Sequence, residues 1–411
     1  MRWSPAASGG LSETHRGLKM VAGTSLKDTP LSFSLTQEQR DIQEMVRDIA
    51  TNEFAPKAAE VDRNHRFPRE NFELMASSDL CGLIFPEEYG GVGLDHISYS
   101  IVVEELAKAC ATTSVIYSAH VSLTASPVYQ WGSEELKQRM LVPMVKGEKL
   151  GAFALSEPGN GSDSAAAHCR AELKGDHFIV NGVKNWITNG VEADYYLVIA
   201  QTDPSLKHRG LVALMIEKGS QGFTFGKLED KLGIRGSSTC QIIFEDTPVP
   251  VENVLGKVGD GFKVAMSTLD GGRIGIASQA VGIAQGAWDH AHKYSHERVA
   301  FNKTINQFQA IQFMMAEMQT EIDTARMLTY NACVAQDMGN RFTKEAAIAK
   351  LYASEVAMRN TVKCVQIFGG YGYVTDYPAE RYMRDAKITE IYEGTSEIQR
   401  LVIASNLLKG Q

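Results

Sequence analysis

The sequence has few cysteines, no long apolar run and no excess of positive charge. Its six cysteines lie far apart without a C-x-x-C pair, so neither a disulfide framework nor a zinc site is expected, and a reducing compartment fits better. No segment approaches the roughly 18 uninterrupted apolar residues of a membrane span. A net charge of −8 gives no argument for nucleic-acid binding. The sequence also lacks a Walker loop and a G-x-G-x-x-G motif after a strand, so a Rossmann nucleotide site is not expected.

The remaining composition is that of an ordinary soluble globular protein. The chain has 411 residues, 44% hydrophobic and 22% charged, which is enough for two or three domains. Residues 1–30 are rich in Ser, Gly and Ala, carry Arg2, Arg16 and Lys19, and lack the apolar stretch of a secretory signal. They are expected to be disordered, an artificial extension or a mitochondrial transit segment, although Glu13 and weak amphipathicity count against the last. The expected location is the mitochondrial matrix in a eukaryote and the cytoplasm otherwise.

Hydrophobic periodicity divides the chain into three parts. Residues 35–149 show helical spacing, residues 150–255 hold short β-rich runs, and residues 260–411 return to long helical runs. We predict an α+β fold with an N-terminal α-helical domain, a middle antiparallel β domain and a C-terminal four-helix bundle. The helices predicted in the last part span residues 261–298, 308–338, 343–369 and 378–387.

Several local signals support this division. Thr36 followed by Gln39 predicts a capping box at the first helix. A second helix is predicted from Phe67-Pro68 to Leu83, and another from Ser98 to Ala111. In the middle part, Lys174-Gly175-Asp176 and Asn181-Gly182 predict turns between strands.

The stretch from Asp385 to Arg400 carries the main candidate for chemistry. Glu393 lies next to the ring of Tyr392 and is followed by Gly394, where the backbone can approach a ligand closely. Thr395 or Ser396 can cap the helix that follows. A carboxylate among apolar neighbours has a raised pKa, which makes it a usable base near neutral pH. The alternative is a solvated loop acid at the start of a C-terminal helix.

Three further motifs are candidates for ligand contacts. The segment 154–163 exposes backbone N–H groups at two glycines and adds two serine hydroxyls, so it can line a planar polar ligand or a phosphate, or be a simple polar turn. Trp186, within 185–189, can cover a flat ring system or fill the core. The paired glycines within 366–373 mark either a close approach of backbone to a ligand or chain, or an ordinary helix end.

Together these segments resemble the acyl-CoA dehydrogenase family over about Leu35 to Leu408. Two family signatures occur, A-L-S-E-P-G-N-G-S-D at 154–163 and Q-I-F-G-G-Y-G-Y-V-T-D at 366–376, with Arg381 and Asp385 beyond the second. The resemblance is greatest to the short-chain (butyryl-CoA) branch. That branch is matched by K-L-G-I-R-G-S-S-T at 231–239, G-R-I-G-I-A-S-Q at 272–279 and I-T-E-I-Y-E-G-T-S-E-I-Q-R-L-V-I-A at 388–404.

The resemblance implies FAD held between the β domain and the C-terminal bundle. The implied flavin contacts are Phe153, Leu155, Ser156, Gly161, Ser162, Trp186, Ile187, Thr188, Thr395, Ser396 and Glu397. The residues implied to reach the cofactor of a neighbouring subunit, in the family's homotetramer (a dimer of dimers), are Arg298, Gln309, Gln366, Gly369 and Gly370. Contacts with the acyl-CoA are implied for Ser162, Asp270, Arg273, Tyr392 and Gly394.

The reaction implied by the resemblance is α,β-dehydrogenation of a short-chain acyl-CoA to a trans-2-enoyl-CoA in fatty-acid β-oxidation. Glu393 would take the pro-R α-proton while the β-hydrogen leaves as hydride to flavin N5, and electrons would pass to electron-transferring flavoprotein. The thioester oxygen would be held by the backbone N–H of Glu393 and a flavin ribityl hydroxyl. In the isovaleryl and long-chain branches the base lies at the position of Gly272, and glycine cannot be a base. Gln279 and Thr389 match residues that make the acyl cavity shallow.

Three alternatives stay open at this point. The same fold serves short branched acyl groups, and it can run in reverse as a 2-enoyl-CoA reductase. A non-catalytic assembly factor on this scaffold is the third, and it predicts a degraded base or flavin loop. The run from Ala109 to Ala119 has no cation, which argues against a dicarboxylic acyl group such as glutaryl.

Overall fold

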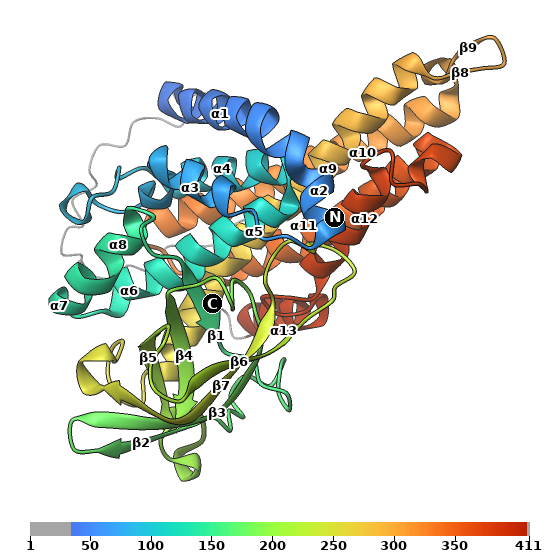
Figure 1. Ribbon diagram of the computed structural model, residues 1–411. Helices are drawn as coiled ribbons and strands as arrows, with labels where there is room; N and C mark the ends of the chain where they lie inside the picture. The colour runs from blue at the N-terminus through green and yellow to red at the C-terminus, as the bar shows by residue number, and fades with distance from the viewer. Residues whose placement is uncertain (1–33, 409–411) are drawn as a thin grey trace, which may run out of the picture.

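Helices occupy both ends of the chain and a sheet lies between them in sequence (Figure 1). The computed structural model describes residues 34–408, so the predicted leading segment 1–30 lies outside the described residues. In Figure 1 the helices form the upper part of the molecule and the sheet the lower part. The order of helices, sheet and helices, and the α+β class, are as predicted.

The N-terminal helices are short and are interrupted by π-helical and 3₁₀ turns. They comprise α1 (Gln37–Ile49), η1 (Ala50–Phe54), α2 (Ala55–Asn64), α3 (Arg69–Ser77), η2 (Leu80–Gly82), η3 (Glu87–Tyr89), α4 (His96–Ala109), α5 (Ala111–His120), η4 (Val121–Ala125), α6 (Ser126–Trp131), α7 (Glu134–Leu136), η5 (Lys137–Leu141) and α8 (Val142–Val145).

Local chemistry sets the ends of these helices. The predicted capping box is confirmed, because Gln39 N donates to Thr36 Oγ1 at 3.1 Å and Thr36 N donates to Gln39 Oε1 at 2.9 Å. The helix predicted to reach Leu83 ends at Ser77, since Asp79 adopts a left-handed φ of 57°. The helix predicted over Ser98–Ala111 stops before Cys110, whose backbone is extended.

The middle segment forms one seven-stranded sheet, in the order β1-β4-β2-β3-β7-β6, with β5 also paired to β4. The strands are β1 (Gly151–Ala154), β2 (Arg170–Lys174), β3 (His177–Ile187), β4 (Tyr195–Gln201), β5 (Leu211–Glu217), β6 (Phe223–Leu228) and β7 (Cys240–Pro250). Most pairs are antiparallel as predicted, but β4 runs parallel to both β1 and β2.

One predicted turn is correct and the other is wrong. Gly175 and Asp176 form the two-residue connection of the β2–β3 hairpin, in which Lys174 pairs with His177. Asn181-Gly182 instead lies inside β3, at a bulge opposite β7. Gly182 has φ 146°, and a Cβ there would lie 2.7 Å from the Cα of Cys169, so this glycine serves close backbone packing rather than chain reversal.

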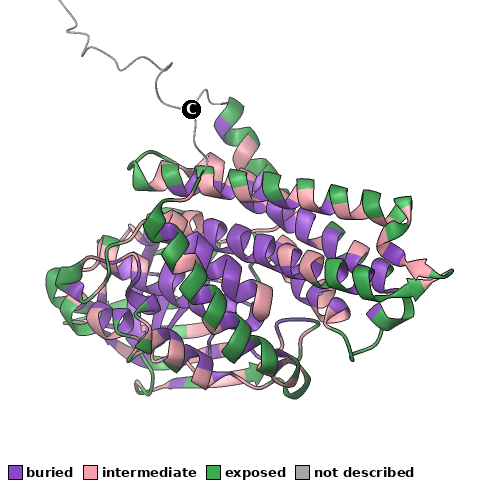
Figure 2. Cartoon of the chain, turned by 90° about the horizontal axis from the view of Figure 1, so that it is seen from above, coloured by how far each residue is buried: buried purple, intermediate pink, exposed green. Residues whose placement is uncertain are grey.

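The C-terminal helices are long and form the bundle that was predicted. They are α9 (Gly261–Glu297), α10 (Gln309–Asp337), α11 (Thr343–Phe368), α12 (Ala379–Lys387) and α13 (Ser396–Leu408), with the hairpin β8 (Val299–Ala300) and β9 (Lys303–Thr304) between α9 and α10. Figure 2 shows that the inner helices are almost wholly buried while the outer ones expose one side. One apolar core joins the sheet to the N-terminal helices, and a second fills the bundle.

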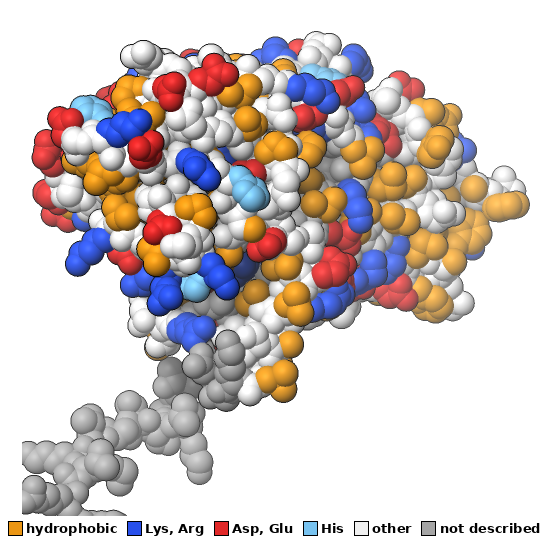
Figure 3. All heavy atoms as spheres, turned by 90° about the horizontal axis from the view of Figure 1, so that it is seen from below, with side chains coloured by type: hydrophobic (Ala, Val, Ile, Leu, Met, Phe, Trp, Pro, Cys, Tyr) orange, Lys and Arg blue, Asp and Glu red, His pale blue; other side chains and the backbone are white. Residues whose placement is uncertain are grey.

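Large apolar side chains are exposed at the end of the bundle that carries the β8–β9 hairpin (Figure 3). We call this group the hairpin-end patch, and it consists of Val299, Phe301, Phe313, Tyr371, Tyr373 and Val374. Exposed apolar side chains that gather on one surface are a common feature of protein–protein contact sites.

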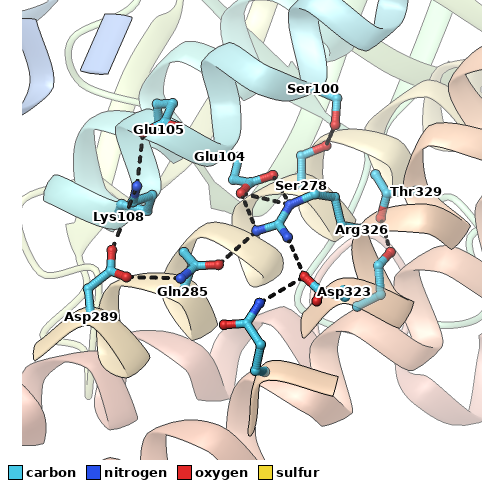
Figure 4. Close-up of polar contacts among 12 residues, drawn as sticks. Ser100, Glu104, Glu105, Lys108, Ser278, Gln285, Asp289, Asp323, Arg326 and Thr329 are labelled. Carbon is cyan, nitrogen blue, oxygen red and sulfur yellow. Dashed lines mark hydrogen bonds and ion pairs between the residues drawn. The ribbon is translucent and has the colours of Figure 1, made fainter. Parts of the chain in front are cut away.

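Buried ion pairs connect α4 to the bundle (Figure 4). Glu104 accepts hydrogen bonds from Arg326 of α10 at 2.7 and 3.1 Å, and the same guanidinium donates to Gln285 of α9 at 2.9 Å. Glu105 pairs within the N-terminal helices, with Arg47 of α1 at 2.8 Å and Lys108 of α4 at 3.2 Å. A buried charge that loses its partner is costly, so the Glu104–Arg326 pair helps to fix how α4 docks on the bundle.

Within residues 34–408, no helix is long and apolar enough to cross a membrane. The same residues contain no group of three or more His, Cys, Asp or Glu side chains that could hold a metal ion.

Candidate active site

Glu393 lies in the tight turn that joins η10 (Ile388–Glu390) to α13. Its φ is 55°, a left-handed conformation that non-glycine residues rarely adopt, and Gly394 follows with φ 90°. The turn is held from outside the motif. Gln399 Nε2 donates to the carbonyl oxygens of Glu393 and Gly394 at 3.0 and 2.9 Å, and Lys350 Nζ donates to the Gly394 oxygen at 2.7 Å.

The Glu393 carboxyl points into the protein rather than into solvent. Its Oε2 is buried without a hydrogen-bond partner among the described residues. A Cβ at Gly272 of α9 would lie 2.9 Å from this oxygen and 2.6 Å from Leu123. Burial raises the pKa of Glu393 to about 7, although the Arg273 and Lys350 cations act to lower it. The turn therefore presents a carboxylate whose pKa suits proton transfer near neutral pH.

Polar side chains close one side of this region. The Tyr392 hydroxyl donates to Gln279 Oε1, and Gln279 Nε2 in turn donates to the Ala111 carbonyl at 3.0 Å. Gln279 and Thr389 are fully buried, and the Thr389 hydroxyl donates to the Ala386 carbonyl at 2.7 Å. Burial also raises the pKa of the Tyr392 phenol well above its usual value, so this hydroxyl stays protonated.

A charged pair lies beside Gly272 on α9. Arg273 Nη1 and Asp270 Oδ1 are 2.5 Å apart, and the Thr343 hydroxyl donates to Asp270 Oδ2 at 2.6 Å. The Nε of Arg273 is buried and has no hydrogen-bond partner among residues 34–408. Burial raises the pKa of Asp270, and Arg273 opposes that effect. The unpartnered Nε leaves this guanidinium able to donate to a ligand.

Buried side chains hold one side of the loop after β1, and its other side is open. Lys184 Nζ donates to the Leu155 carbonyl at 2.9 Å and pairs with the Glu157 carboxylate at 2.7 Å, with both side chains buried. A Cβ added at Gly159 or Gly161 would meet nothing within 4 Å. The loop thus has a rigid base and a free edge, which suits contact with a ligand.

Trp186 has the exposure expected of a ligand-covering ring rather than of core filler. Its side chain is 59% exposed, whereas Ile187 is buried and Thr188 is half-buried. Trp186 lies within β3, near a register shift against β7, and has φ 62°. The irregular backbone turns the indole outward from an otherwise buried strand end.

Another group of predicted site residues does not come near Glu393 in this chain. Arg298 ends α9, 25 residues beyond Arg273, which is roughly 38 Å along a helix rising 1.5 Å per residue. Its guanidinium lies 5.4 Å from the ring centre of Tyr371. Gln309, Gln366, Gly369 and Gly370 lie at the same end of the bundle. Within one chain, these residues therefore lie too far along the bundle to share a site with Glu393.

The remaining predicted residues are spread over the two loops. Phe153 is half-buried on β1, and Ser156 and Ser162 lie on the loop that follows. The Thr395 hydroxyl accepts from Ile398 N at 3.3 Å, so it caps α13. Ser396 Oγ is buried without a partner among the described residues, and Glu397 is exposed.

Sequence patterns missed three residues that hold these loops. Lys350, Gln399 and Lys184 are buried and donate to the backbone of the two candidate loops. The signal available in the sequence was weak: a single lysine within the apolar run A-I-A-K-L, and another between two strand residues.

Comparison with known proteins gives a consistent match over the described part of the chain. Family models described as acyl-CoA dehydrogenase N-terminal, middle and C-terminal domains match residues 36–148, 152–247 and 259–408. The short-chain specific acyl-CoA dehydrogenase of Clostridium acetobutylicum is 53% identical over 92% of this chain and 100% of its own length. The short-chain specific acyl-CoA dehydrogenase, mitochondrial, of Mus musculus is 50% identical over 92% of each.

Solved structures agree with the sequence comparison. Butyryl-CoA dehydrogenase from Megasphaera elsdenii is 47% identical, with a TM-score of 0.91, over 92% of this chain and 100% of that one. A chain from a structure named "Electron transferring flavoprotein of Acidaminococcus fermentans: Towards a mechanism of flavin-based electron bifurcation" is 52% identical, with the same score and coverage.

Proposed function

Because the chain belongs to the acyl-CoA dehydrogenase family, we propose that it removes the α-proton and β-hydrogen of a short-chain acyl-CoA with Glu393 as the base. The product is a trans-2-enoyl-CoA. The observation that carries this proposal is the Glu393 carboxyl, whose Oε2 is buried, has no hydrogen-bond partner among residues 34–408 and lies against Gly272. An unpartnered buried carboxylate is unfavourable unless it serves a function.

FAD is the cofactor of this family, and two features of this chain fit it. The exposed indole of Trp186 offers a flat apolar cover for a ring system, and the loop from Leu155 to Ser162 offers a free edge of backbone and hydroxyl donors. Leu155, Ser156, Ser162, Trp186 and Thr188 would hold the cofactor at this edge. When bound, FAD supplies the acceptor for the β-hydrogen and two electrons.

Glu393 contributes the proton-transfer step. A thioester α-proton is weakly acidic and becomes removable when donors hold the carbonyl oxygen as the enolate forms. We assign one such donor to the backbone N–H of Glu393, within the same left-handed turn. The Oε2 atom is buried, and burial raises the pKa of the carboxyl to about 7, so the carboxylate is basic enough to take the proton.

Residues on α9 and η10 support a short acyl chain. Gln279 is fixed between the Tyr392 hydroxyl and the Ala111 carbonyl, and Thr389 of η10 is also buried. These polar groups would end the acyl cavity after a few carbons, since a longer chain would displace their hydrogen bonds. On the CoA side, the free Nε of Arg273 and the hydroxyl of Ser162 are the proposed polar contacts.

A homotetramer, a dimer of dimers, follows as part of the proposal. Arg298, Gln309 and the paired glycines Gly369 and Gly370 lie at the opposite end of the bundle from Glu393, next to the hairpin-end patch. A second copy covering this patch would bring them to its partner's cofactor. Electron-transferring flavoprotein is the proposed electron acceptor, which the similarity to the Acidaminococcus fermentans structure supports.

One observation favours the reverse reaction at the same site. The chain resembles one from a structure named for flavin-based electron bifurcation, so reduction of a 2-enoyl-CoA is the second candidate. A short branched acyl group is also compatible with the shallow cavity. The assembly-factor alternative is not favoured, because the base, the loop after β1 and Trp186 are all present.

The proposed location stays the mitochondrial matrix in a eukaryote and the cytoplasm otherwise. The Mus musculus relative is named mitochondrial.

Anaerobic stopped-flow reduction of the FAD-loaded protein tests the proposed substrate class. We expect butyryl-CoA to bleach the flavin faster than isobutyryl-, 2-methylbutyryl- or octanoyl-CoA. Gln279→Ala removes a polar side chain that would end the acyl cavity. It should raise the rate of flavin reduction by octanoyl-CoA, relative to that by butyryl-CoA, by about tenfold or more. Gln37→Ala, an exposed glutamine on α1, is the matched control. Equal rates for all four substrates in the parent protein would contradict the short-chain assignment.

A further inference from the structure

A buried lysine supports the turn that carries Glu393. Lys350 of α11 is 0% exposed, and its Nζ donates to the Gly394 carbonyl at 2.7 Å. Gln399 of α13 donates to the carbonyl oxygens of Glu393 and Gly394. Two helices therefore hold two consecutive carbonyl groups of the left-handed turn.

The surroundings of Lys350 are unusual for a buried cation. Lys184, which is equally buried, has the Glu157 carboxylate 2.7 Å from its Nζ. Within residues 34–408, Lys350 has no carboxylate close enough for an ion pair, and its hydrogen bond goes to a backbone oxygen. Burying an ammonium without a close anion is costly, so an ordinary role in packing does not account for this residue.

Charged groups face this turn from several elements. Arg273 of α9, Glu390 of η10 and Glu397 of α13 interact with Lys350 through their charges, as does Glu393 itself. Arg273 is 2.5 Å from Asp270, and Glu390 is 2.6 Å from Lys387. The Glu393 charge also acts to raise the pKa of two phenols, Tyr99 of α4 and Tyr392.

Lys350 differs from the other cation near the base. Arg273 forms an ion pair with Asp270, whereas Lys350 forms no ion pair among the described residues. Burial lowers the pKa of Lys350 to about 7, and the Glu393 carboxylate opposes that effect. The ammonium and the carboxylate therefore stabilise each other's charged forms.

We propose that Lys350 is a positioning residue for the base: it holds the Glu393–Gly394 backbone in its left-handed conformation, and its positive charge favours the ionised form of the Glu393 carboxyl. This inference rests on the proposed role of Glu393. It distinguishes the effect of hydrogen bonding from the effect of charge, because Gln399 donates hydrogen bonds to the turn without a charge, whereas Lys350 donates a hydrogen bond and carries a positive charge.

The test compares Lys350→Met, Gln399→Ala and Lys363→Met in the full-length FAD-loaded protein. For Lys350→Met, the midpoint of the acid limb of kcat/KM for butyryl-CoA should move up by about one pH unit, and the rate at pH 7 should fall about tenfold or more. Gln399→Ala should lower the rate without moving the midpoint. Lys363→Met, on the same helix but partly exposed, should change neither.

Infrared titration supplies a readout that does not depend on turnover. The band of the protonated Glu393 carboxyl is identified by its loss in Glu393→Gln, and its midpoint should rise in Lys350→Met. Lys350→Arg keeps the charge and should keep the midpoint near the parent value while lowering the rate, so it serves if Lys350→Met does not fold. An unmoved midpoint in folded Lys350→Met, or a raised one in Lys350→Arg, would overturn the inference. Failure of butyryl-CoA to reduce the parent protein would instead overturn the proposed function.

Discussion

At the scale of single residues, the site depends on residues whose backbone conformations are uncommon. Glu393 has φ 55° and Trp186 has φ 62°. A left-handed conformation costs a non-glycine residue about 1–2 kcal/mol, so it persists only where the surroundings enforce it. At Glu393 the enforcement comes from Lys350 and Gln399, which hold its turn by three hydrogen bonds to two carbonyls.

The pKa of Glu393 predicts how activity depends on pH. A base must be deprotonated to accept a proton, and burial raises this pKa to about 7. The value of kcat/KM for butyryl-CoA should therefore be constant above about pH 8 and fall about tenfold per unit below about pH 7. Stopped-flow and steady-state measurements over roughly pH 5 to 9 span this midpoint and check the prediction. A midpoint near the ordinary glutamate value of about 4.3 would show that the base is solvated.

The sequence predicted the candidate base but not the residues that hold its turn. Glu393 was recognisable because a motif surrounds it, with Tyr392 before and Gly394 after. Lys350 lies 43 residues earlier on a different helix, and a single lysine in an apolar run does not indicate what it faces. Its role appears only when α11 and α13 pack together and bring Nζ to the Gly394 oxygen.

At the scale of elements, long helices were predicted closely and short strands were not. The starts and ends of α9, α10, α11 and α12 fall within one residue of prediction, because Gly339 and the glycines near 369 interrupt the periodicity. β2 and β6 carry charged or polar residues on much of each strand, so their alternation is weak and the sequence gives little sign of them. Asn181-Gly182 was misassigned because the same pair that favours a turn also suits a bulge.

The buried pair of Arg326 and Glu104 should dominate the docking of α4 on the bundle. Arg326→Met leaves the Glu104 carboxylate buried without its partner, so the free energy of unfolding should fall by about 3–5 kcal/mol. Adding Glu104→Leu to that variant should recover much of the loss, since no charge then remains buried. Chemical denaturation of each variant measures this.

Arg400→Met is the matched control for that experiment. Arg400 pairs with Glu355 at the surface, and an exposed pair contributes about 0–1 kcal/mol. A loss in Arg326→Met no larger than in Arg400→Met would mean that the α4 contact does not depend on this ion pair.

At the scale of the whole molecule, two halves of the predicted site lie at opposite ends of one bundle. The family resemblance predicted site residues at both ends of the bundle. Hydrophobic periodicity does not show which of these residues would meet within one chain and which would meet only between two copies. The length of α9 between Arg273 and Arg298 supplies that information. The hairpin-end patch lies beside the distant group, which supports assembly through that end.

Phe301 is the side chain best placed to test this assembly. It is 90% exposed in the turn between β8 and β9, so Phe301→Glu should leave the monomer fold unchanged while preventing a partner from covering the patch. We expect light scattering to show a smaller species than the parent protein forms, with weaker retention of FAD. Leu173→Glu, an exposed leucine on β2, is the control and should not change the mass. A mass in Phe301→Glu equal to that of the parent protein would place the interface elsewhere.

The most direct measurement is flavin reduction in Glu393→Gln, which keeps the shape of the side chain and removes its ability to accept a proton. The purified variant should remain yellow, because the substitution leaves the loop after β1 and Trp186 unchanged, while its reduction by butyryl-CoA should fall by several orders of magnitude. Glu44→Gln, on the exposed side of α1, makes the same chemical change far from the turn and should be reduced at close to the parent rate. If Glu393→Gln is bleached by butyryl-CoA at nearly the parent rate, Glu393 is not the base and the account of this site is wrong.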